Sequence, residues 1–496
     1  PYSLGGNLVN TIHQGRTGII WVGMMNKGLN WIDPQKQVFQ HFYPVPGQPG
    51  SLNSNLIKAV YEDKRGNIWV GAYNGGLSLF DPNTNQFTPF LQADDKGNLN
   101  RNNVERIFED TRGLLWIGTD GGGLFFFDRN SQTFTDFNTT LSGTRLSGKA
   151  IWAICEDAKG NIWIGTADDG LNRLDTKTNQ LYHYRYHPND PNAINSNDIR
   201  VIIEDHLGML WIGTYGGGLN QYNPSSQTFT HYTTSKNNQN TISNDIITAI
   251  FESPSTHQLW IGTFGGGLNR FDRMTGTFTS FREKHGLAND VIKSIEEDQE
   301  GKLWISTLKG ISKFDPDTET FVNYTSAMAL QGNGFNLGAS CLAQNGAMYF
   351  GGTNGLNRFF PQGIQNLPNH NHDCLITDLK ILNRSIQPGA LIRNKVILQK
   401  TITETQKLRI PYFIDDFTFE FSALHFAGAN NIKYAYQLTG INEDWQYTDA
   451  SRRYASFSNL RPGHYTFRVK ASNTKGVWSD KITELELTIL PAPWAT

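Results

Sequence analysis

Cysteine is scarce in this chain of 496 residues, which contains only three. Cys155, Cys341 and Cys374 are scattered, without the paired spacing of a disulfide framework or a zinc site. We therefore predict free thiols, buried in the fold, and no metal site.

Long apolar runs and an excess of one charge are also lacking. The 43 Lys and Arg residues nearly balance the 45 Asp and Glu residues, which gives a formal net charge of −2. A nucleic-acid-binding chain would show a basic stripe, and a membrane-spanning helix needs about 18 apolar residues in succession. The sequence therefore predicts neither a nucleic-acid partner nor a membrane span within these residues.

Recognisable catalytic motifs are missing as well. No Gly-x-Ser-x-Gly elbow occurs, and glycine triplets such as Gly216–Gly218 are not followed by the helix of a phosphate-binding loop. The carboxylate run Glu296-Glu297-Asp298 lies in a predicted strand, where adjacent side chains point to opposite faces. We therefore predict no catalytic residue and no cofactor in this part of the protein.

What the sequence does contain is a repeat. Tryptophan returns within motifs such as Gly66-Asn-Ile-Trp-Val-Gly71, at intervals of 44 to 49 residues, and Tyr349 takes the eighth position. The repeated tryptophans are Trp21, Trp69, Trp116, Trp163, Trp211, Trp260 and Trp304. Self-similarity at this period indicates a solenoid, an array or a propeller.

Each repeat carries signals for four short strands. In the second unit, turn residues such as Asp63 and Gly66 separate β-rich runs at 56–61, 67–71, 77–80 and 86–90. A four-stranded antiparallel blade buries both faces only when it packs in a ring of blades. We therefore expect an all-β propeller in which the tryptophans fill the space between the blades.

The repeated pattern Glu-Asp-x-x-Gly-x-Ile-Trp-Ile-Gly-Thr, followed by Gly-Gly-Gly-Leu-Asn, resembles the two-component regulator propeller repeat. The resemblance covers about residues 1–366. Eight units could close an eight-bladed ring, whereas the resemblance implies seven-bladed rings, often two in tandem. In the second case the first unit is the remnant of an upstream propeller, and the sequence leaves both ring sizes open.

A second domain is expected at 374–491, after a linker at 367–373 and before a tail at 492–496. Asp416–Ser422 alternates with period two, which predicts a half-buried strand. The run Leu460-Arg-Pro-Gly-His-Tyr465 predicts the tyrosine corner of an immunoglobulin- or fibronectin-like β-sandwich.

This second domain resembles the Y_Y_Y domain, which follows such propellers in sensor proteins. The residues that carry the resemblance are Lys433–Leu438, Gly440, Trp445, Tyr454, Leu460–Gly463 and Tyr465.

Function is expected where the repeats differ, because the needs of folding are shared by all units. Two positions differ sharply: one in the opening strand, which lines the central channel of a propeller, and one just after the Trp-Ile-Gly-Thr strand. Strand order places both on one face, and their aromatics and charges suit a sugar. For any single residue, the alternative is an ordinary exposed loop position. The predicted ligand-binding residues are Lys58, Tyr73, Glu105, Asp120, Trp152, Arg200, Tyr215, Phe264 and Lys293.

The resemblance implies the extracytoplasmic sensing region of a two-component sensor, on the periplasmic or extracellular side of a bacterial inner membrane. It implies a histidine kinase as output, a homodimer that relays the signal through the Y_Y_Y domain, and a membrane anchor that follows Thr496. We expect a small molecule or oligosaccharide, foremost a glycan, as ligand. Two alternatives stay open: a propeller lyase or hydrolase acting on polysaccharide, and a protein-binding scaffold.

Overall fold

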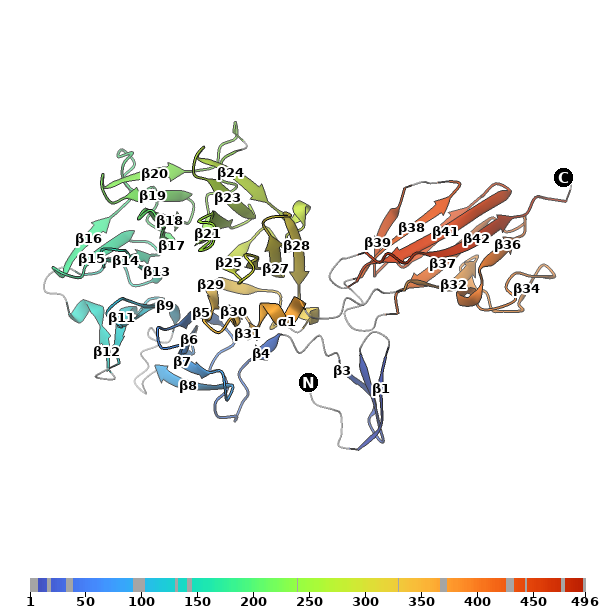
Figure 1. Cartoon of the computed structure of the whole chain (residues 1–496), viewed down its shortest axis with the longest axis horizontal. Helices are drawn as coiled ribbons and strands as arrows, with labels where there is room; N and C mark the ends of the chain where they lie inside the picture. The colour runs from blue at the N-terminus through green and yellow to red at the C-terminus, as the bar shows by residue number, and fades with distance from the viewer. Residues whose placement is uncertain are drawn as a thin grey trace. The chain divides into compact units, whose positions relative to one another are not determined.

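The computed structural model divides the chain into two compact units. One spans Lys36–Asn366, and the other combines Pro1–Gln35 with Leu367–Thr496 (Figure 1). The structure describes residues 8–15, 19–32, 39–91, 103–129, 133–140, 145–238, 240–328, 330–365, 373–424, 432–441, 444–473 and 478–493. Most of the predicted linker at 367–373 and of the predicted tail at 492–496 therefore lies outside the described residues. Within them, no helix is long and apolar enough to cross a membrane.

The unit Lys36–Asn366 is a ring of blades (Figure 1), each an antiparallel sheet of four strands. The first three blades hold β5 (Ile57–Glu62), β6 (Ile68–Ala72), β7 (Gly76–Asp81) and β8 (Gln86–Leu91); β9 (Val104–Glu109), β10 (Leu115–Thr119), β11 (Gly123–Asp128) and β12 (Thr133–Asp136); and β13 (Ile151–Glu156), β14 (Ile162–Thr166), β15 (Leu171–Asp175) and β16 (Gln180–Tyr184).

The next three blades repeat this order. They hold β17 (Ile199–Glu204), β18 (Leu210–Thr214), β19 (Leu219–Asn223) and β20 (Thr228–Tyr232); β21 (Ile247–Glu252), β22 (Leu259–Thr263), β23 (Leu268–Asp272) and β24 (Thr277–Phe281); and β25 (Ile292–Glu297), β26 (Leu303–Thr307), β27 (Gly310–Asp315) and β28 (Thr320–Tyr324). Among the described residues of the ring, short 3-10 helices lie between strands at Phe137–Thr139, Glu283–His285 and Ser326–Met328.

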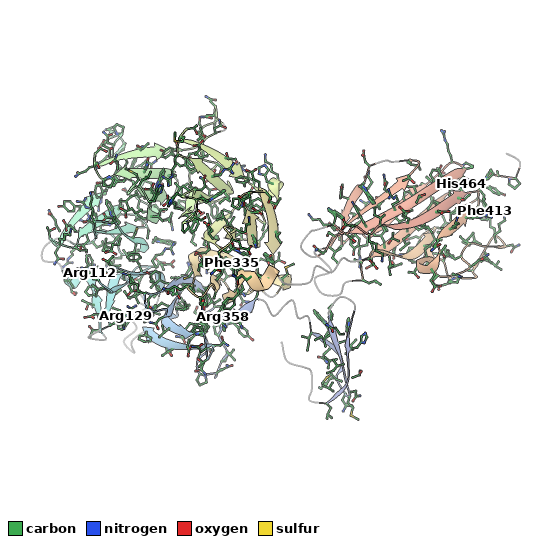
Figure 2. The ribbon with its side chains drawn as sticks, viewed as in Figure 1. Arg112, Arg129, Phe335, Arg358, Phe413 and His464 are labelled. Atoms are coloured by element: carbon green, nitrogen blue, oxygen red, sulfur yellow. The ribbon has the colours of Figure 1, made fainter. Side chains whose placement is uncertain are left out.

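Blade seven closes the ring with a strand from the other end of the unit. It holds β29 (Phe335–Leu342), β30 (Met348–Gly352), β31 (Gly355–Phe359) and β4 (Gln40–Phe42), and α1 (Pro361–Gln365) follows β31. The pairing of β4 with β31 satisfies the backbone groups at the edge of the last blade. Arg358 secures it, because its Nε donates to Oε1 of Gln40 (2.6 Å) and its Nη1 to the carbonyl of Pro82 in blade one (3.1 Å) (Figure 2).

The first repeat unit therefore forms no blade of its own. Its first three strands, β1 (Val9–Gln14), β2 (Ile20–Met24) and β3 (Gly28–Ile32), make a separate three-stranded sheet, and its fourth is β4. The predicted all-β propeller is confirmed, and the described residues give the seven-bladed alternative. The compact unit begins at Lys36, whereas the predicted propeller began at residue 1, because the first unit is split between two sheets.

Six of the seven predicted tryptophans, from Trp69 to Trp304, form the core of the ring, whereas Trp21 lies in β2 of the separate sheet and is half-buried. Trp211, for example, is fully buried and lies 5.2 Å from the ring of Phe271 in the next blade. Its Nε1 donates to the carboxylate of Asp205 (2.7 Å), the residue predicted to open a turn. The same bond joins Trp69 to Asp63, Trp116 to Asp110, Trp163 to Asp157 and Trp304 to Asp298, at 2.7 to 3.0 Å. The aspartate therefore shapes the turn and also satisfies the buried indole.

The glycine triplets serve the turns. At Gly267 the backbone φ is +81°, and a β-carbon there would lie 2.2 Å from the carbonyl oxygen of Phe281. A side chain would meet both a backbone conformation that favours glycine and a steric clash.

The C-terminal part of the second unit is a β-sandwich. One sheet has the order β33-β32-β37-β40 and the other β36-β42-β41-β38-β39. Phe419 and Phe467 join them through rings 4.8 Å apart. The elements are β32 (Leu375–Ile381), β33 (Arg384–Ser385), β34 (Leu391–Ile392), β35 (Lys395–Val396), a 3-10 helix (Ile402–Glu404), β36 (Lys407–Ile410), β37 (Asp416–Ser422), β38 (Lys433–Thr439), β39 (Gln446–Asp449), β40 (Tyr454–Ser458), β41 (Gly463–Ala471) and β42 (Thr483–Ile489).

The tyrosine corner is present: the hydroxyl of Tyr465 donates to the carbonyl of Arg461 (2.9 Å). All three cysteines are free thiols, as predicted, but only Cys374 is fully buried, while Cys155 and Cys341 are partly exposed. Burial raises the pKa of the Cys155 and Cys374 thiols to about 12. These thiols are therefore unreactive at neutral pH.

Candidate functional site

The opening strands of blades one to six each contain a β-bulge at the position that the sequence analysis selected. In blade one the ladder passes from Ile57 directly to Ala59, which leaves Lys58 unpaired. A bulge turns its extra residue out of the ladder and re-aims the side chain. The residues skipped in this way are Lys58, Glu105, Trp152, Arg200, Thr248 and Lys293.

Lys58 reaches across the central channel. Its Nζ lies 3.3 Å from Oε1 of Glu105 in blade two and 5.9 Å from the ring centroid of Trp152 in blade three. It also lies 5.8 Å from the ring of Tyr73 in its own blade. Burial raises the pKa of Glu105, and the charge of Lys58 opposes this rise. Three predicted residues therefore surround the lysine, and with it they form one group of four.

Arg200 extends this group to blade four. Its guanidinium carbon lies 4.1 Å from the ring centroid of Trp152 and 5.1 Å from that of Tyr215. Its Nη2 donates to Oδ2 of Asp198 (2.7 Å), which fixes the guanidinium between the two aromatic rings. Asp198 was not among the predicted residues, because it lies just before the strand that carried the pattern.

Lys293 and Phe264 form a second pair, with Nζ 5.5 Å from the ring centroid. Burial lowers the pKa of Lys293, and the positive charge of Lys58 lowers it further. The side chains of Phe264 and Tyr215 are 42% and 50% exposed, so two aromatic surfaces stay open to solvent. Asp120 is half-buried, and its charge contributes to raising the pKa of Glu105.

Arg106 is a channel residue that the sequence analysis missed. Its Nη1 donates to the carbonyls of Glu105 (2.6 Å) and of Leu337 in blade seven (3.1 Å), so the side chain crosses the channel in front of blade one. A β-carbon on Gly338 would lie 2.9 Å from its guanidinium. A signal for Arg106 was present in the repeat, because the matching ladder positions hold small or apolar residues: Ala59, Ala153, Val201, Ala249 and Ser294.

The opposite ends of the opening strands carry structural carboxylates. Glu109 of blade two accepts the backbone N–H of Lys64 in blade one (2.6 Å). Arg129 bridges Glu109 and Asp63 at 2.5 and 2.7 Å (Figure 2). In the same way, a backbone N–H of the preceding blade donates to the carboxylate of each of Glu156, Glu204, Glu252 and Glu62. These carboxylates join neighbouring blades.

The carboxylate run at 296–298 does not form a catalytic pair. Glu296 accepts from the hydroxyl of Ser340 (2.7 Å), Glu297 from that of Ser255 (2.6 Å), and Asp298 from the indole of Trp304. Burial raises the pKa of Glu296 to about 7. The three side chains thus serve three separate contacts.

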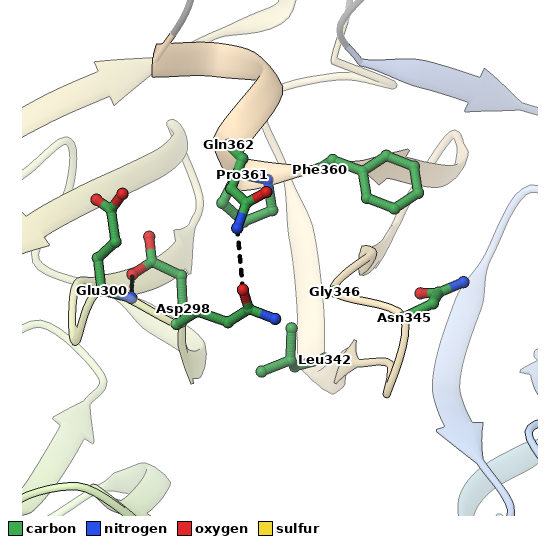
Figure 3. A pocket seen from close by; sticks show the side chains of 9 residues that line it. Asp298, Glu300, Leu342, Asn345, Gly346, Phe360, Pro361 and Gln362 are labelled. Carbon is green, nitrogen blue, oxygen red and sulfur yellow. Dashed lines mark hydrogen bonds between the residues drawn. The ribbon is translucent and has the colours of Figure 1, made fainter.

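Two further features lie away from the channel residues. A pocket of about 60 Å³, between the Asp298 turn and α1, has room for about two water molecules. Gln362 donates to Gln299 across it (2.9 Å; Figure 3). Elsewhere, potential metal ligands of His206, Glu252 and His257 lie within 4.8 Å of one another.

The carboxylate of this trio is already engaged. Oε1 of Glu252 accepts from Nδ1 of His206 and from Nη2 of Arg273, both at 2.6 Å. We therefore assign no metal role to the trio, and the absence of a metal site stays a prediction.

Comparisons with known proteins identify the parts of the chain. The two-component regulator propeller family matches residues 51–74, 98–121, 145–168, 193–216 and 286–309, and the Y_Y_Y domain matches residues 425–490. The chain contains these repeats and this domain, as the sequence analysis predicted.

Histidine kinase P4 of Formosa agariphila is 32% identical over 212 residues, which are 43% of this chain and 15% of the kinase. The extracellular domain of a protein described as a hybrid two-component system of B. thetaiotaomicron superposes with a TM-score of 0.80 at 26% identity, covering 99% of this chain and 62% of that one. The chain therefore spans less than two thirds of either relative.

A virginiamycin B lyase from Staphylococcus aureus shares only the fold. Its TM-score is 0.50 at 13% identity, and the match covers 64% of this chain and 98% of the lyase. The sensor-derived structure therefore carries the functional comparison: the chain resembles the extracellular region of a two-component sensor.

Proposed function

We propose that this chain is the extracytoplasmic ligand-sensing region of a two-component sensor and that the channel face of its propeller binds a glycan or oligosaccharide. The observation that carries the proposal is the meeting of Lys58, Trp152 and Arg200 from three different blades. Beside them, the exposed rings of Tyr215 and Phe264 offer stacking surfaces for the apolar faces of sugar rings.

The fixed cations supply the polar half of such a site. Arg200 is held by Asp198, and Lys58 by Glu105, so both are positioned before a ligand arrives. Pre-positioned groups lose little entropy on binding, which favours recognition of hydroxyl-rich ligands.

Trp152→Ala and Arg200→Ala are each expected to weaken oligosaccharide binding by about ten- to a hundredfold. A lost aromatic contact or charged hydrogen bond is worth about 1–3 kcal/mol. Isothermal titration calorimetry against neutral and acidic oligosaccharides measures this, with the exposed turn variant Lys177→Ala as control. Unchanged affinity in both site variants would reject this face as the binding site.

The same titrations separate the alternative functions. Cleaved oligosaccharide in the recovered samples would favour a lyase or hydrolase. Binding of a protein partner that Arg200→Ala abolishes, without any saccharide binding, would favour a scaffold.

The relay is proposed to run from the propeller through the Y_Y_Y domain at 374–491 to a membrane-anchored histidine kinase in a homodimer. A ligand can shift such a dimer only by its difference in affinity for the two arrangements. We expect saturating ligand to change the dimer dissociation constant of the chain by at least tenfold in sedimentation velocity. An identical constant with and without bound ligand would count against the relay.

A further inference from the structure

We propose that the channel mouth holds an anionic group of the ligand, a carboxylate or a sulfate, between Lys58 and Lys293 from the two blades that flank blade seven. This inference rests on the proposed function, whose ligand class it narrows to acidic saccharides.

Basic side chains gather in the channel. Lys58, Arg106, Arg200 and Lys293 project from blades one, two, four and six. The carboxylates in direct contact with them are Glu105, beside Lys58, and Asp198, beside Arg200. Arg106 donates to two backbone carbonyls, which carry no formal charge. The cations in the group therefore outnumber their carboxylate partners.

Like Arg106, Lys293 forms no ion pair with a carboxylate among the described residues. It is half-buried against Phe264, and the charge that acts on it is the like charge of Lys58. A partly desolvated ammonium next to a second ammonium is unfavourable unless an anion joins them. Such an anion would gain two charge-assisted contacts at once.

Blade seven lies between the two blades that carry the lysines. In the alignment of the repeats, Gly338 of blade seven stands at the position of Lys58 in blade one and of Lys293 in blade six. Glycine has no side chain there. The guanidinium of Arg106 lies against this glycine, since a β-carbon there would be 2.9 Å from its Nη2. A third cation thus lies against the blade between those that carry the two lysines.

The neighbouring aromatics fit the rest of an acidic sugar. Phe264 beside Lys293 and Tyr73 beside Lys58 each pair a ring with an ammonium group. A uronate or a sulfated sugar has the same combination of an apolar ring face and a charged substituent. The geometry therefore points to the charged substituent at the lysines and the sugar ring on the aromatics.

The first test uses inorganic sulfate alone, which probes the anion site without a sugar. Thermal unfolding midpoints are compared in sodium sulfate and in sodium chloride of equal ionic strength, for the native chain, Lys293→Met and the exposed control Lys177→Met. Sulfate also stabilises proteins non-specifically, and that part is common to all three. We expect an additional sulfate-dependent rise that Lys177→Met retains and Lys293→Met loses. Equal rises in all three proteins would overturn the anion site.

The second test uses matched saccharides in calorimetry: oligogalacturonate with its carboxyl-reduced form, and sulfated galactan oligosaccharides with their desulfated forms. We expect one charged member to bind at least tenfold tighter than its neutral partner, and Lys293→Met to remove the difference. The pair that responds identifies carboxylate or sulfate.

The two tests separate failure of this inference from failure of the proposed function. Equal or tighter binding of the neutral members would leave a glycan sensor but overturn the anion site. A sulfate effect lost in Lys293→Met, with no saccharide bound, would support the anion site and reject the glycan ligand.

Discussion

Trp211→Ala is expected to lower the free energy of unfolding of the propeller by about 3–5 kcal/mol. The indole is fully buried and contacts Phe271 (5.2 Å between ring centroids) and Tyr232 (5.7 Å). Its loss leaves a cavity between two blades and removes a donor from Asp205, which then keeps only its remaining partners, Arg273 among them. Urea-induced unfolding followed by circular dichroism measures the change.

Two phenylalanine variants separate packing from the hydrogen bond. Trp211→Phe retains most of the ring but leaves Asp205 without the indole donor, and we expect a loss of about 1–3 kcal/mol. In blade five, Ser253 stands where blades one to four and blade six have the aspartate, so Trp260→Phe removes no bond to a carboxylate and is expected to cost less. Equal losses in the two variants would mean that the indole–aspartate bond contributes nothing measurable.

A chain that starts at residue 44 lacks β4. Truncation of the Phe39 side chain alone would lower the free energy of unfolding by about 3–5 kcal/mol, and we expect this deletion to lower it further. Phe39 is buried and lies 4.9 Å from the ring of Phe359. Removal of β4 also leaves the edge of β31 unpaired and takes Gln40 away from Arg358. Urea-induced unfolding measures the stability, and light scattering reports association through the open edge.

The matched control for this deletion is a chain that starts at residue 36. It lacks β1, β2 and β3 but retains β4, and we expect its propeller to unfold at the same urea concentration as that of the full chain. If the chains starting at 36 and 44 unfolded alike, the ring would not depend on closure by β4.

The strands and turns within a blade could be predicted because the same sequence signals recur in each repeat. The turn at Asp63 and the strand at Trp69 followed from residue types and spacing. The bond between these two side chains did not, because the aspartate already had a sufficient reason to be there as a turn residue. Ring size could not be predicted either. It depends on pairings such as that of Asn357 with Gln40, 317 residues apart, for which no local pattern exists.

The position of the candidate site could be predicted more completely than the set of residues that form it. Lys58, Trp152 and Arg200 were found because aligned repeats differ there, and the bulges explain why these side chains meet in the channel. Arg106 was missed because it lies one position further along the strand, although an arginine among the small or apolar residues of the other repeats was a signal. The identity of the ligand does not follow from these repeat positions, because it depends on the distances between side chains of different blades and on their charges.

The bulges also bear on how such a propeller can diverge in evolution. A bulge residue such as Arg200 has no partner in the ladder with β18, and its neighbours, the buried Ile199 and the partly buried Val201, maintain the contact between blades. An exchange at the bulge position therefore alters the lining of the channel at little cost to folding. Descendants of one gene could acquire different ligands by substitutions at a few such positions, blade by blade, while the scaffold stays the same.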